Sequence, residues 1–134
     1  MLQFVFHGKP ITKLRARMSK SGFVYDPQNE QKKISVRSVK DILKQKDFKE
    51  VMKSAVGVKI MLHTQMPNSW SDKKKAEWVG KYDVTKPDID NCIKFYFDVM
   101  NKLVYYDDCQ ICKLYSEKRY AYDPRVEVLI KEIF

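Results

Sequence analysis

One acidic segment that contains a proline, KPDIDN at residues 86–91, marks where a helix begins. Pro87 disfavours helical backbone at the residue before it, and Asp90 or Asn91 can accept hydrogen bonds from the free N–H groups of a first turn. The residues that follow alternate between two stripes at helical spacing. The apolar stripe consists of Ile89, Cys92, Ile93, Tyr96, Val99 and Met100. The sequence therefore predicts an amphipathic helix that buries one side and displays carboxylates and a lysine on the other.

A second acidic pair, Asp107-Asp108, follows the apolar run 103–106, which predicts the end of a short strand or a tight turn. Grouped carboxylates repel one another, and a bound divalent cation would offset that repulsion. Magnesium prefers carboxylate oxygens, with water and substrate phosphate as its other ligands. Asp88, Asp90 and Asp108 could converge to form such a site. In the alternative interpretation, the first two complement the helix dipole and the later pair is an ordinary turn.

The residues around both acidic pairs resemble the RusA-like Holliday-junction resolvases. The resemblance rests on KPDIDNCIK at 86–94, DVMN at 98–101 and YYDDCQ at 105–110, and extends more weakly to 8–10, 15–17 and the strand ending at Lys118. It implies an α+β fold and a homodimer. It also implies that the metal ligands are Asp88, Asp90 and Asp108, and that Lys94 assists catalysis. Cys92, Leu103 and Cys109 depart from the commoner family residues, but none of them replaces a ligand.

The function that this resemblance implies is a Mg²⁺-dependent endodeoxyribonuclease that resolves four-way (Holliday) DNA junctions by paired phosphodiester hydrolysis in DNA recombination and repair. Two alternatives stay open. One is a metal nuclease with broader branched-DNA or RNA substrates, and the other is a non-catalytic, basic nucleic-acid-binding module whose acidic cluster is structural. Because a four-way junction has approximate two-fold symmetry, paired cuts also call for two chains related by a two-fold axis.

The charge balance points to a polyanionic partner. Lys and Arg number 26 against 17 Asp and Glu, so a formal net charge of +9 accompanies an acidic candidate site. The basic excess must lie elsewhere on the surface, where nucleic acid is its natural partner. The candidate DNA contacts are Arg15, Arg17, Lys86 and Lys118. Arg15 and Arg17 would share one side of an extended segment and form a forked donor pair for phosphate, unless the segment is only a solvated basic loop.

Several polar residues have two interpretations. Lys94 can stabilise phosphate charge or form an i,i+4 pair with Asp90. We expect Asp98 either to support the metal ligands or to pair with Lys94, and Asp107 to be a turn residue. The segment 67–83 is interpreted as a short helix or a flap. Its Trp70, Trp78 and lysines 73–75 could contact exposed bases and phosphates. Alternatively, the two tryptophans cover the core while the lysines stay in water.

The complete pattern predicts a single α+β domain over residues 1–134. Its mixed β-sheet of about four to five strands is covered by two main helices. The expected strands lie at 2–6, 56–66, 111–120 and 125–133, with a hairpin tip at Ser21-Gly22 and a packing helix at 29–46. At 134 residues and 44% hydrophobic content, the chain can bury a core without disulfides or structural metal ions.

No apolar run approaches the roughly 18 residues of a membrane span. The first residues lack the charged segment and cleavage site of a signal peptide. We therefore expect a cytoplasmic protein with no membrane partner, three reduced cysteines and no small-molecule cofactor. Cys109 and Cys112 have zinc-like spacing, but too few His and Cys residues remain to complete four ligands, so we do not expect zinc.

Overall fold

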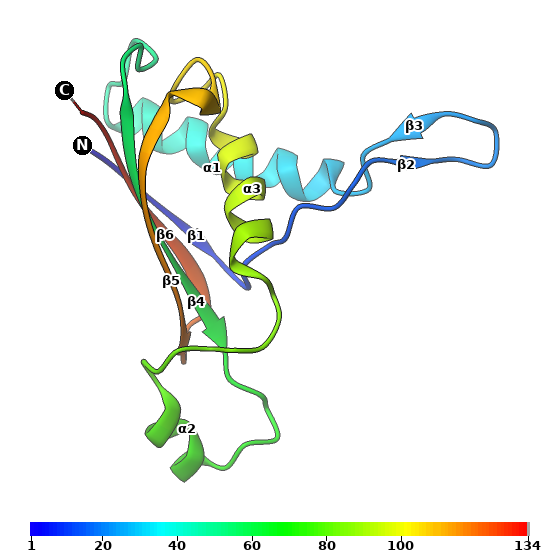
Figure 1. Cartoon of the computed structure of the whole chain (residues 1–134), viewed down its shortest axis with the longest axis vertical. Coiled ribbons are helices and arrows are strands. Elements are labelled where there is room, and N and C mark those ends of the chain that lie inside the picture. Colours follow the sequence, from blue (N-terminus) through cyan, green and yellow to red (C-terminus); the bar gives the residue numbers. More distant parts are fainter. Residues whose placement is uncertain (134) are drawn as a thin grey trace.

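The computed structural model, which describes residues 1–133, is built on a mixed four-stranded sheet (Figure 1). Its strand order is β1 (Leu2–His7), β6 (Arg125–Glu132), β4 (Val56–Gln65) and β5 (Ile111–Ala121). The β5 strand runs parallel to β4, whereas the other neighbours are antiparallel. The predicted α+β class with a mixed sheet is confirmed.

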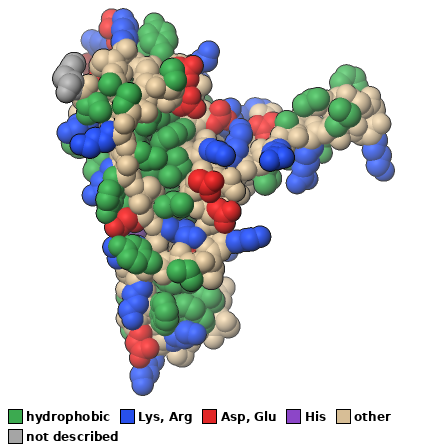
Figure 2. All heavy atoms as spheres, in the orientation of Figure 1, with side chains coloured by type: hydrophobic (Ala, Val, Ile, Leu, Met, Phe, Trp, Pro, Cys, Tyr) green, Lys and Arg blue, Asp and Glu red, His purple; other side chains and the backbone are tan. Residues whose placement is uncertain are grey.

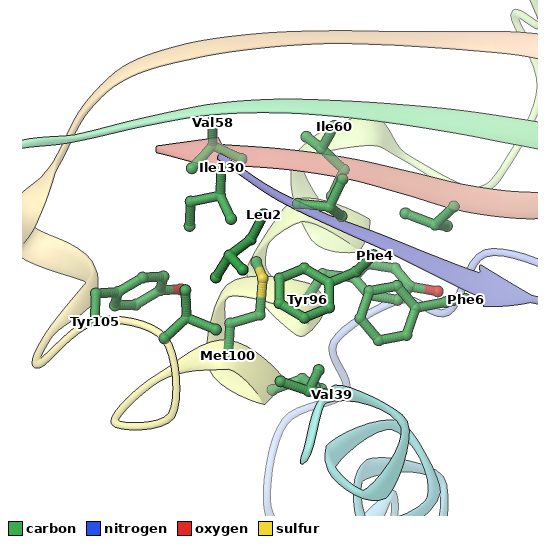
Figure 3. Packing of buried hydrophobic residues seen from close by; sticks show 14 of the residues in the cluster. Leu2, Phe4, Phe6, Val39, Val58, Ile60, Tyr96, Met100, Tyr105 and Ile130 are labelled. Atoms are coloured by element: carbon green, nitrogen blue, oxygen red, sulfur yellow. The ribbon is translucent and has the colours of Figure 1, made fainter. Parts of the chain in front are cut away.

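Two helices, α1 (Asn29–Gln45) and α3 (Ile89–Met100), cover one face of this sheet (Figure 1). Alternate residues of β4 and its neighbours point into the layer between sheet and helices, as the period-two pattern predicts. The core is rich in aromatic rings, and the Phe6 and Tyr96 centroids lie 5.0 Å apart (Figure 3). Both predicted main helices are therefore packing elements, and α3 also presents a polar side to solvent.

The smaller elements also follow the sequence closely. The hairpin of β2 (Arg17–Met18) and β3 (Val24–Tyr25) turns through Gly22, which has the positive φ of +89° that glycine tolerates. The short-helix interpretation of the 67–83 segment is confirmed by α2 (Asp72–Trp78). Within residues 1–133, no helix has both the length and the apolar character required to cross a membrane.

Candidate active site

The helix α3 begins two or three residues earlier than expected from Asp90 or Asn91 as its cap. Asp88, with extended backbone, occupies the N-cap position, and the helix begins at Ile89. The expectation that Asp90 or Asn91 caps the helix is therefore wrong, because Pro87 restricts its own φ and the backbone of Lys86 but not the residues after it, so the chain can become helical immediately after Asp88. The Asp88 side chain makes no capping hydrogen bond. Both Asp88 and Asp90 are exposed, so their carboxylates remain accessible to a ligand.

Asp83 anchors the segment that leads into α3. Asp83 is only 6% exposed, and its carboxylate accepts hydrogen bonds from Thr64 Oγ1 (2.7 Å), Thr85 N (2.8 Å) and Thr85 Oγ1 (2.6 Å). Burial alone would raise the pKa of Asp83, but the hydrogen bonds from Thr85 and Thr64 hold it below its usual value. An ionised Asp83 thus ties the segment to β4. Sequence reasoning missed this residue, although Asp-x-Thr is a recognisable local turn signal.

Lys118 holds the same segment from β5. Its Nζ donates to the carbonyl oxygens of Thr85 and Pro87, the latter at 2.6 Å. The ammonium group expected to contact DNA is thus directed at the backbone immediately before Asp88. Lys118 is therefore a positioning residue in this structure, and its contact with DNA stays a prediction. Lys86 lies between the two contacted carbonyl groups and is exposed.

The second acidic pair forms a fixed turn, as predicted. Asp107 caps the 3-10 helix η1 (Asp108–Gln110) in a reciprocal arrangement, because it accepts from Cys109 N and its own N–H donates to Gln110 Oε1 (2.9 Å). Gln110 Nε2 also donates to Met52 O (2.9 Å), which fixes the turn beside the start of β4. Asp108 is exposed, and a hydrogen bond with the Asp107 side chain raises its pKa.

The two acidic groups lie at opposite ends of α3 (Figure 1). Asp88 and Asp90 are at its N-terminus, whereas the 107–108 turn follows its C-terminus, where Asn101 bridges to Tyr105. A helix of 12 residues is about 18 Å long. Within residues 1–133, no three His, Cys, Asp or Glu side chains come close enough together to hold a metal ion. A single chain thus does not bring Asp108 to Asp88 and Asp90.

The remaining polar side of α3 differs from expectation at one residue. Asp98 does not pair with Lys94 but accepts from Lys13 Nζ and Lys32 Nζ, each at 2.8 Å. This pairing was missed because both lysines come from segments distant in sequence, one of them on α1. These lysines hold the pKa of Asp98 below its usual value, although burial opposes them. Lys94 is exposed, and no salt bridge joins it to Asp90 in the described part of the chain.

The tryptophans of the 67–83 segment pack on the end of the sheet. The Trp70 and Trp78 ring centroids lie 5.4 and 6.2 Å from that of Tyr120, which is 6% exposed. Lys74 Nζ lies 4.4 Å from the Trp70 ring centroid. The arrangement favours the covering role for these rings over contact with bases.

Comparisons with known proteins agree with the motifs. A family model described as "Endodeoxyribonuclease RusA" matches residues 7–131. A relative in Bacillus subtilis (strain 168), named "Uncharacterized protein YqaN", is 33% identical over 137 residues, which cover 98% of this chain and 96% of the relative. The family match includes the anchored segment, α3 and the 107–108 turn. The chain therefore belongs to the RusA endodeoxyribonuclease family.

Proposed function

We propose that this protein is a magnesium-dependent endodeoxyribonuclease that resolves four-way DNA junctions by paired cuts in recombination and repair. The observation that carries the proposal is the start of α3, where the side chains of Asp88 and Asp90 are exposed and Asp88 makes no capping hydrogen bond. Hydrogen bonds of Asp83 and Lys118 hold the segment that leads into this helix. A rigid pair of accessible carboxylates suits the positioning of a hydrolytic centre. Membership of a junction-resolving family supplies the substrate class.

The donor set fits magnesium. Asp88, Asp90 and Asp108 offer hard carboxylate oxygens at exposed positions. When bound, the ion would lower the pKa of a coordinated water and neutralise charge on the scissile phosphate. Lys94 lies one helical turn after Asp90, so its ammonium can stabilise negative charge that develops on the phosphate oxygens.

We further propose a composite site in a homodimer, since α3 separates the acidic groups of one chain. Ligand oxygens must lie about 2.1 Å from magnesium, whereas the helix between Asp90 and the 107–108 turn is about 18 Å long. A two-fold axis could bring Asp108 of one chain to Asp88 and Asp90 of its partner. The dimer would then contain two equivalent sites, as paired cuts on a symmetric junction require.

The edge of β5 is a suitable place for this two-fold axis. The segment 80–83 covers the edge only near its end, where Gly80 N donates to Tyr120 O and Asp83 N to Lys118 O. In the described chain, no strand pairs with the outer edge of the earlier part of β5. Leu114 and Tyr115 are exposed there, at 46% and 53%. An open strand edge with apolar side chains favours pairing with a second strand.

Antiparallel pairing of two β5 edges around Leu114 would set residue 110 of one chain opposite Lys118 of the other. Lys118 holds the backbone just before Asp88, and Asp108 lies two residues before Gln110. The pairing would therefore place the start of one α3 beside the acidic turn of the partner. Such a pairing is thus the arrangement in which we propose that the composite site forms.

A metal titration on synthetic DNA tests the proposed function. We expect cleavage of a four-way junction in magnesium, none in EDTA, and binding without efficient cleavage in calcium, whose larger and looser shell positions water and phosphate poorly. Flap and linear duplex substrates of the same sequence serve as controls. Equal cleavage of all three substrates would favour the broader nuclease, whereas binding without cleavage in any metal would favour the non-catalytic module.

Replacing both Arg15 and Arg17 with alanine should weaken junction binding and flatten its salt dependence. Both side chains are exposed, and we propose that they neutralise phosphates. The slope of log affinity against log salt should fall in magnitude by about 1 for each lost phosphate contact, without a change in the magnesium requirement. The matched control replaces Lys44 and Lys46, exposed at the far end of α1. If both double variants change the slope equally, the effect reflects net charge and not these arginines.

A further inference from the structure

The β2–β3 hairpin and its flanks, residues 13–25, form an arm that projects away from the sheet and the helices (Figure 1). Its exposed apolar side chains are Leu14 (40%), Met18 (71%), Phe23 (73%), Val24 (69%) and Tyr25 (46%). A two-stranded hairpin has no second layer that could bury them. A group of apolar side chains exposed in this way marks an interaction surface.

The tip of the arm is internally ordered. Ser19 N donates to Phe23 O (2.7 Å), Phe23 N donates to Ser19 Oγ (3.0 Å), and Gly22 N donates to Ser19 O (3.0 Å). These bonds close the turn and fix the backbone of Phe23. The most exposed ring of the arm is thus presented from a defined position.

The two faces of the arm differ in chemistry. Arg17 pairs across the hairpin with Tyr25, and Met18 pairs with Val24, so these pairs point to opposite faces. Figure 2 shows hydrophobic side chains along one side of the arm and Lys or Arg side chains along the other. Residues 13–25 contain no Asp or Glu. The face with Arg17 and Tyr25 therefore suits phosphates, the face with Met18 and Val24 suits an apolar surface, and Phe23 lies next to β3 at the closed end of the arm.

The base of the arm is fixed to the helix that carries the candidate ligands. Lys13 N donates to Asn91 O (3.0 Å), and Lys13 Nζ lies 2.8 Å from Asp98 Oδ2. The buried Gln28 accepts from Leu14 N (2.7 Å) and donates to Thr12 O. A ligand bound by the arm would therefore be held at a fixed position relative to the start of α3.

We infer that the arm binds the branch point of the DNA junction, with Arg15 and Arg17 on phosphates and with Met18, Phe23 and Val24 against bases that are unstacked where strands exchange. Apolar side chains inserted between bases stabilise distorted DNA, and base stacking on aromatic rings tolerates any sequence. The arm carries Lys13, Arg15, Arg17 and Lys20 and no acidic residue, so its local charge is complementary to the phosphates of DNA. This inference rests on the proposed substrate.

The test uses Phe23→Ala in calcium, with a synthetic four-way junction that carries 2-aminopurine beside the exchange point. The wild-type protein should raise the fluorescence, because the probe becomes unstacked. The variant should lose most of that rise and bind the junction about tenfold more weakly, the scale of one lost base–aromatic contact. Its affinity for linear duplex should stay within about twofold of wild type. Ile34→Ala, which removes a 65%-exposed side chain from α1, is the matched control.

Three outcomes would overturn the inference. They are unchanged junction binding and fluorescence in Phe23→Ala, an equal loss of affinity for junction and linear duplex, and a loss of self-association in sedimentation, which would assign the arm to a second copy. Because this assay needs no cleavage, a failure of the proposed nuclease function would instead be seen in wild-type protein with magnesium.

Discussion

Replacing Asp108 with asparagine is expected to lower magnesium-dependent junction cleavage by at least about a hundredfold, the scale of losing a major electrostatic element of an active site. The substitution removes a charged metal ligand but keeps the size of the side chain. Asp108 is exposed, so the fold and the thermal unfolding midpoint should be preserved. Single-turnover cleavage measures the loss. Junction affinity in calcium should persist or rise, because a negative charge that faces phosphate has gone.

The neighbouring residue offers a matched control. Asp107 carries the same charge, but in the structure it caps η1. Asparagine keeps an oxygen that can accept the capping hydrogen bond, so Asp107→Asn should have a much smaller effect on cleavage. If Asp108→Asn cuts junctions at the wild-type rate, Asp108 is not a ligand.

The fold could be predicted from the sequence because its strong periodicities agree with its turn residues. Alternation in β4 and helical spacing in α1 and α3 each have one buried face, so the sheet and its covering helices follow from pattern alone. The residue at which α3 begins is less clearly determined by the sequence than the helix itself, because Asp88, Asp90 and Asn91 are all acceptable caps. In the structure, contacts from Thr64 and Lys118 hold residues 83–87 in place, and the helix begins directly after them, at Ile89.

The residue types of the candidate site could also be read from the sequence, but their arrangement in space could not. Sequence spacing does not reveal that α3 separates Asp90 from the 107–108 turn. Nor does it reveal that Asp98 pairs with lysines of other segments, or that Lys118 binds carbonyl groups. Each of these contacts depends on which elements pack together. Convergence of Asp88, Asp90 and Asp108 stays a prediction, and in this arrangement of the chain it depends on the proposed partner.

Mixing two inactive variants should therefore restore activity. In a heterodimer of Asp90→Asn with Asp108→Asn, one composite site carries both substitutions, whereas the other combines the unaltered Asp88 and Asp90 of one chain with the unaltered Asp108 of its partner. Free exchange at equal concentrations makes about half of the dimers heterodimers, so about a quarter of the wild-type sites should return. Cleavage of the four-way junction in magnesium measures the recovery, with each variant alone as the control.

The products distinguish the composite site from simpler explanations. A heterodimer with one intact site should nick one strand of the junction and leave the symmetric strand uncut, because its second site lacks two carboxylates. If each site lay within one chain, both sites of the heterodimer would be damaged, and mixing would restore nothing. Sedimentation at micromolar concentration should report about twice the 15.9 kDa chain mass for each variant and for the mixture. Absence of recovery in a verified heterodimer would exclude shared ligands and return the metal site to a single chain, which would then have to change the arrangement of its acidic groups on binding DNA.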